Sequence, residues 1–258
     1  MDNADTNLQR IRLWDVPTRL FHWLLLLAVV TAVVSGMVGG DWMALHGMAG
    51  LLILGLLAFR LIWGFVGNRY ARFVNFFPWP SRLLSYLHGR WHGLGHNPLG
   101  ALSVFAMLAL LSLQVGTGLF SNDEIAFTGP LFGIVSDALS LRLTGLHRLL
   151  SGVLLGMLGL HLAAVMFYTF VKKDNLIKPM LTGFKDRIDH QTDATEDAGE
   201  DADADAQPKS SGWIALGIAL AVAAIAACLA SGILLRKAPT QTLTPNSTQT
   251  SAPSQPAW

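Results

Sequence analysis

The chain has 258 residues, of which 52% are hydrophobic and 14% charged, and its mean hydropathy of +0.45 is typical of a membrane protein and not of a soluble domain. The formal net charge of +1 leaves no basic surplus to neutralise phosphates, so a nucleic-acid partner is not expected. Cys228 is the only cysteine, which excludes an intrachain disulfide, thioether-linked haem and a cysteine-ligated iron–sulfur cluster.

Five stretches are apolar and long enough to cross about 30 Å of hydrocarbon as helices, which takes roughly 20 residues each. They are residues 20–39, 42–66, 99–120, 144–171 and 213–235. The first begins after Asp15 and Pro17, a possible cap and a proline suited to a first helical turn. A cleaved signal peptide is the alternative for this first stretch, but the run is long for one and lacks a clean A-x-A end.

The predicted fold is therefore an all-α integral membrane protein, with a four-helix up-down transmembrane bundle and a fifth, C-terminal transmembrane helix. We divide the chain into a transmembrane domain at 1–184, an acidic flexible linker at 185–211, the additional helix at 212–237 and a Ser/Thr/Pro-rich disordered tail at 238–258. The loop 68–98 mixes aromatic and basic residues and is expected at the level of the lipid headgroups.

Lysines and arginines gather before the first stretch, between the second and third, and after the fourth, whereas the opposite loops carry mainly acidic residues. By the positive-inside rule we expect a multi-pass membrane protein with a cytoplasmic N-terminus. The fifth stretch conflicts with this bias, because Arg236 and Lys237 would then end outside. Five crossings are still favoured, because Lys185, Arg187 and Lys209 hold its other flank inside.

Four histidines lie inside these stretches: His22, His46, His147 and His161. An ionisable side chain in a membrane helix is costly and suggests a function, although a histidine hydrogen-bonded between helices is the plainer alternative. His147 and His161 are 14 positions apart, so they share a helix face about 21 Å apart along the axis. In an alternating bundle His22 then pairs with His161 and His46 with His147. Two such pairs at two depths suit two haems with histidine on both axial faces, a ligation that favours one-electron transfer.

The surroundings of these histidines suit a porphyrin better than a bare metal. Gly36 lies 14 positions after His22 and would leave room for a flat macrocycle. Arg60 lies 14 positions after His46, and a buried arginine in lipid requires an anion such as a haem propionate. Arg19 and Arg148 could act in the same way, although Arg19 could also snorkel to the interface.

Two further patterns have structural interpretations. Gly152 and Gly156 form a G-x-x-x-G on the helix face opposite the histidines, which indicates helix packing. His88, His92 and His96 recur every fourth residue and could form a zinc site, but glycines among them weaken any helix there, which favours a surface role.

Four segments together resemble the bacterial cytochrome b(561) family, which is similar to the b-type cytochrome subunits of nickel–iron hydrogenases. The segments are "RLWDVPTRLFHW", "HGMAGLLILGLLAFRLIWGF", "GHNPLGALSVFAMLALLSLQVGTGLF" and "LHRLLSGVLLGMLGLHLAAV", and the similarity covers roughly Arg10 to Phe184. The resemblance implies a four-helix core with two noncovalent b haems and exchange of electrons with membrane quinones. The family's ligand positions fall on His22, His46, His147 and His161, and its basic positions on Arg19 and Arg60.

The leading hypothesis is a membrane di-haem cytochrome b that transfers electrons between the quinone pool and a redox partner, such as a periplasmic cytochrome c or a hydrogenase. A haem-containing membrane anchor of a larger oxidoreductase is the first alternative. A histidine-based transporter of divalent metal is the second, and it is disfavoured because the spans lack the additional acidic or polar ligands of such a pathway. The sequence does not identify the residues of a quinone site.

Overall fold

The computed structural model describes residues 8–90, 97–125, 127–188 and 211–233. Five helices in this part of the chain are long and apolar enough to cross a membrane, in agreement with the sequence prediction. They are α1 (Val16–Val38), α2 (Met43–Val66), α5 (Pro98–Leu119), α6 (Asp137–Met166) and α9 (Ser211–Ala230). A π-helical turn, η4 (Phe167–Val171), continues α6.

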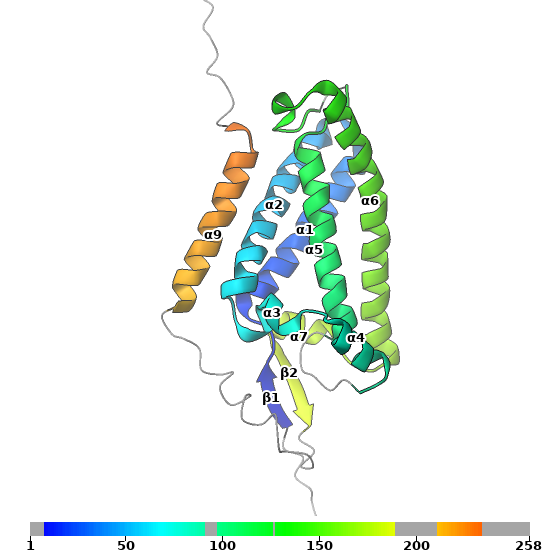
Figure 1. Ribbon diagram of the computed structural model, residues 1–258, viewed down its shortest axis with the longest axis vertical. Coiled ribbons are helices and arrows are strands. Elements are labelled where there is room, and N and C mark those ends of the chain that lie inside the picture. The colour runs from blue at the N-terminus through cyan, green and yellow to red at the C-terminus, as the bar shows by residue number, and fades with distance from the viewer. Residues whose placement is uncertain (1–7, 91–96, 126, 189–210, 234–258) are drawn as a thin grey trace, which may run out of the picture.

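The helices α1, α2, α5 and α6 run up, down, up and down, as Figure 1 shows. The closest packing joins α1 to α2 and α5 to α6, and α2 also touches α5. We call the end of the bundle with the α5–α6 loop the upper end and the opposite end the lower end, as they stand in Figure 1.

The fifth helix, α9, lies outside the four and packs along α2 (Figure 1). The contact uses small residues: Ala219 is fully buried, and a Cβ at Gly55 would lie 3.5 Å from the Ala223 carbonyl oxygen. Just beyond α9, Gly232 lies beside the upper loop, because a Cβ at Gly232 would lie 2.5 Å from the Pro130 carbonyl oxygen. Helix α9 therefore runs upward, parallel to α1, as five crossings require.

Local sequence signals explain where the helices begin. The Asp15 carboxylate accepts a hydrogen bond from the Thr18 amide at 2.9 Å, and Pro17 occupies the first turn of α1. Asn97 and Ser136 cap α5 and α6 in the same way. The cap at Ser136 starts α6 at Asp137, two turns earlier than the apolar stretch predicted, because hydropathy alone does not register the polar first turns of a helix.

The centre of the bundle is a layer of aliphatic side chains contributed by all four helices. Its buried members are Ala28 and Val29 of α1, Ile53 and Leu57 of α2, Leu111 and Val115 of α5, and Leu154 of α6. Val29, Ile53 and Leu154 each lie seven positions after a predicted ligand, at His22, His46 and His147 respectively. The layer therefore separates the upper histidines from the lower ones by about 10 Å of helix on each side.

Short elements close the two ends. At the upper end lie η1 (Gly40–Trp42) and η3 (Phe132–Ile134), and at the lower end η2 (Arg69–Ala71), α3 (Phe73–Phe76), α4 (Pro80–Leu87) and α7 (Ile177–Thr182). The phenol of Tyr86 in α4 is hydrogen-bonded to that of Tyr168 in η4. This bond raises the pKa of Tyr86 to about 12 and links the loop to the bundle.

A two-stranded antiparallel sheet also lies at the lower end, and the sequence analysis did not predict it. It pairs β1 (Leu8–Arg12) with β2 (Phe184–Ile188), with Arg10 opposite Asp186. Residues 185–188, which we assigned to the flexible linker, thus belong to a strand. The acidic part of that linker, the C-terminal tail and His92, His96 and His190 lie outside the described residues.

Candidate functional site

The upper pair of histidines comes together as the sequence predicted. The ring centroids of His46 and His147 are 6.0 Å apart, with the ring planes at 84°. A metal bound between two imidazole nitrogens at about 2 Å each would separate the centroids by roughly 6 Å. The separation in the structure therefore already suits an iron with histidine on both faces.

Main-chain carbonyls of neighbouring helices orient both rings of the upper pair. His46 Nδ1 lies 2.8 Å from the Ala32 carbonyl oxygen on α1, and His147 Nδ1 lies 2.9 Å from the Gln114 carbonyl oxygen on α5. A carbonyl can only accept, so each Nδ1 carries the proton and donates it. Each Nε2 then keeps its lone pair, which is the form in which histidine binds a metal.

Two glycines allow the rings of His46 and His147 to lie close to the backbones of α1 and α5. A Cβ at Gly36 would lie 2.9 Å from His46 Nδ1, and one at Gly118 would lie 3.0 Å from His147 Cε1. We predicted that Gly36 leaves room for a macrocycle, but the structure places the His46 imidazole itself against it. Gly118 was missed because α5 carries no histidine, although a glycine one turn after a lone intramembrane glutamine is a usable signal.

The lower pair lies at the other end of the bundle, with His22 on α1 and His161 on α6. His22 and His161 are close enough for their imidazoles to interact electrostatically, and the indole of Trp23 packs edge-on against His22 with centroids 5.3 Å apart. His22 Nδ1 is buried and has no hydrogen-bond partner among the described residues. Among the described residues, His22 therefore lacks the carbonyl contact that orients each ring of the upper pair.

Arg60 is the most deeply buried charge near the lower pair, with 3% of its surface exposed. Its guanidinium lies 4.5 Å from the centre of the Phe73 ring, and its Nη1 has no hydrogen-bond partner in the described part of the chain. We predicted a haem propionate as the anion that Arg60 needs. The structure supplies a second anion, the buried Asp15 carboxylate, which interacts electrostatically with Arg60 and accepts a hydrogen bond from Trp63 Nε1 at 3.0 Å.

The other two arginines lie in different surroundings. Arg19 donates from Nη1 to the Leu181 carbonyl in the last turn of α7, where a cation is favourable, and its buried Nε lacks a partner among the described residues. Arg148 is exposed on α6. Gly152 and Gly156 are also exposed, and a Cβ at either position would meet no other helix of the described chain within 4 Å. This pair therefore does not pack against a helix of the described chain.

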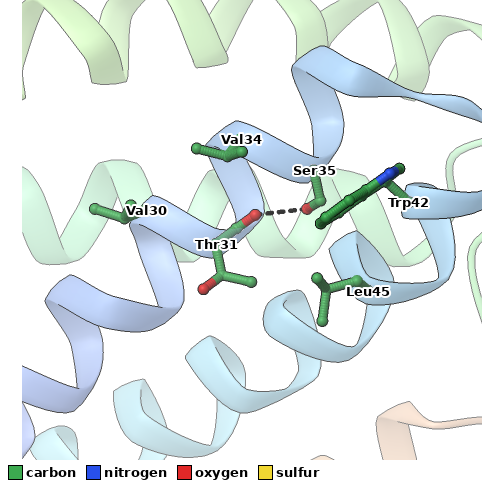
Figure 2. A pocket seen from close by; sticks show the side chains of 6 residues that line it. All are labelled: Val30, Thr31, Val34, Ser35, Trp42 and Leu45. Atoms are coloured by element: carbon green, nitrogen blue, oxygen red, sulfur yellow. Dashed lines mark hydrogen bonds between the residues drawn. The ribbon is translucent and has the colours of Figure 1, made fainter.

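Other candidate sites are weaker. Among the described residues, no three His, Cys, Asp or Glu side chains form a group that could hold a metal ion. A groove of about 250 Å³ lies between α1 and α2, lined by Val30, Thr31, Val34, Ser35, Trp42 and Leu45 (Figure 2). The Ser35 and Thr31 hydroxyls donate to carbonyls of α1 itself, so the groove presents mainly an apolar surface.

The packing of α6 against the other helices is loose enough to fit a haem. Helix α6 carries one histidine of each pair, yet only 6% of its most apolar stretch is buried within the chain, against 44% for α2. It packs mainly on α5 and makes few close main-chain contacts with α1 or α2. The loose packing of α6 beside the four histidines leaves room for a flat group such as a haem. The unpartnered nitrogens of His22, Arg19 and Arg60 fit a group with acidic substituents at its edge.

Comparisons with known proteins agree with this chemistry. The sequence profile described as prokaryotic cytochrome b561 matches residues 13–183. A probable Ni/Fe-hydrogenase B-type cytochrome subunit of Rhizobium leguminosarum is 27% identical over 70% of this chain and 92% of its own length. Proteins of the same description from Escherichia coli K12 and Azotobacter chroococcum are 23% and 26% identical, and the alignments cover 94% and 91% of their lengths. No solved structure matches the chain.

Proposed function

Because the chain belongs to the prokaryotic cytochrome b561 family, we propose that it is a multi-pass membrane cytochrome that holds two noncovalent b haems and transfers electrons between the quinone pool and a redox partner. A haem b with imidazole on both faces has no open coordination position and takes up or releases one electron at a time. The haems would therefore act as electron carriers, and the chain would be an electron-transfer subunit that oxidises quinol or reduces quinone.

The observation that carries this proposal is the upper pair. The 6.0 Å between the rings of His46 and His147 suits an iron between them, and both Nδ1–H groups already donate to carbonyls. Such outer hydrogen bonds fix the tautomer and the orientation of a ligand.

The lower site would be held by His22 and His161, with Arg60 and Arg19 as the cations for acidic groups at the haem edge. The unpartnered Nη1 of Arg60 and Nε of Arg19 support this assignment. The aliphatic layer around Val29, Ile53 and Leu154 would exclude water between the two levels. Two sites about 21 Å apart along α6 would then conduct electrons across most of the bilayer thickness.

The redox partner is proposed from the relatives, which are described as subunits of Ni/Fe hydrogenases. A hydrogenase is therefore the first partner to test and a periplasmic cytochrome c the second. We place the protein in the bacterial inner membrane with its N-terminus in the cytoplasm, because the basic residues gather at the lower end. The acidic linker and the Ser/Thr/Pro-rich tail would then lie on opposite sides of the membrane.

A difference spectrum with quinol as the reductant tests this function. The purified chain should show reduced-minus-oxidised bands of low-spin b haem, and a membrane quinol should develop them at a rate that falls with a quinone-site inhibitor. Haem that dithionite reduces and no quinol reduces would favour the anchor function instead. A protein free of haem would refute both.

A further inference from the structure

Gln114 lies in the upper third of α5, a helix that supplies no predicted ligand. It nevertheless meets both ring nitrogens of His147. Its main-chain oxygen lies 2.9 Å from Nδ1, and its side-chain nitrogen lies 3.2 Å from Nε2. One residue therefore holds the two ends of the same imidazole.

The two contacts together determine the roles of the nitrogens. Because the Gln114 carbonyl can only accept, His147 Nδ1 donates its proton, and Nε2 is left with a lone pair. The Gln114 amide nitrogen can only donate, so it gives a hydrogen bond to that lone pair. This is the lone pair that an iron would take.

The same side chain is incompletely satisfied in this position. Gln114 Oε1 is buried and has no hydrogen-bond partner among the described residues. An unpaired buried carbonyl weakens the state that contains it, because the group has lost its water without gaining another donor. The Gln114 side-chain amide can therefore move away from His147 Nε2 and lose only one hydrogen bond, because its Oε1 makes none in this position.

We propose that Gln114 is a displaceable cap on the coordinating nitrogen of His147. It keeps the imidazole in the ligating tautomer before haem arrives, and it is displaced from Nε2 when iron binds. The main-chain contact to Nδ1 persists in both states. This inference rests on the proposed function, since it assumes that the upper pair binds haem.

The test is a haem titration of the haem-free, full-length protein carrying His161→Ala, in which only the upper pair remains complete. Gln114→Leu removes the competing donor and keeps the main-chain carbonyl in place. The affinity for haem should rise about fivefold, as expected when one neutral hydrogen bond no longer has to be broken. Gln114→Asn, whose amide is one methylene too short to reach Nε2, should act in the same direction if the leucine variant folds poorly.

Ser112→Ala is the matched control, because the exposed Ser112 hydroxyl only donates to Leu108 on the same helix. It should leave the affinity unchanged. Unaltered affinity in both Gln114 variants would refute the cap, and so would weaker binding with a shifted spectrum, since Gln114 would then contact the bound haem. Nitrogen-15 spectra of the haem-free protein separate this inference from the function: Nε2 of His147 should change its shift in Gln114→Leu even if no variant binds haem.

Discussion

Replacing Gly118 by alanine should disable the upper haem site and spare the lower one. The added Cβ would lie 3.0 Å from His147 Cε1 and 3.2 Å from Nδ1, whereas ordinary contacts begin at 3.4 Å. The ring or α5 must therefore shift by about 0.4 Å. Overpacking of this kind costs about 1–3 kcal/mol, which corresponds to roughly a fivefold to 150-fold loss of affinity when the ring must return to bind iron.

Haem titration of the haem-free protein, followed by its low-spin absorption, measures this loss. Gly116→Ala is the control on the same helix, because a Cβ there meets nothing within 4 Å. This variant should bind haem with the same stoichiometry and affinity as the parent chain. Equal losses in the two variants, or a Gly118→Ala protein with two unperturbed haems, would show that His147 does not depend on the close approach of α5.

Three further outcomes follow from the proposed sites. Arg60→Met should lower the midpoint potential of one haem and leave the other unchanged in a redox titration, because a buried cation stabilises the reduced form; a shift of both haems would place Arg60 elsewhere. Acid acetone should extract all the haem, because Cys228 lies far from any histidine in the sequence and no thioether motif exists; haem left on the protein would contradict noncovalent binding. Protease added to right-side-out vesicles should leave residues 196–205 intact, and cleavage there would reverse the topology.

The histidine pairs could be predicted because helical spacing and alternating direction determine them. A separation of 14 residues is close to four turns, so His147 and His161 had to share a face whatever the side chains around them. Each remaining histidine begins a helix whose direction follows from its place in the chain. Periodicity of this kind depends on the backbone alone, which explains why the pairing of His46 with His147 agrees with the structure.

The contacts that complete the sites depend on side-chain packing and were not predicted. The interaction of Arg60 with Asp15 joins the end of α2 to the start of α1, and no spacing rule brings together residues 45 positions apart. Gln114 and Gly118 lie on α5, which contains no histidine. A prediction based on histidine positions therefore could not identify their contacts with His147. The β1–β2 pairing joins the first and last segments of the bundle domain in the sequence. Neither segment has a strong strand pattern.

The haem-to-protein ratio of three matched proteins tests the central claim most directly. The parent chain should bind two b haems, and His147→Ala and His161→Ala should bind one each, with the remaining haem low-spin in both. The two single-haem proteins should also differ in midpoint potential, because each retains a different site. A parent ratio of one, or two low-spin haems in either variant, would contradict the assignment of His46 with His147 and His22 with His161.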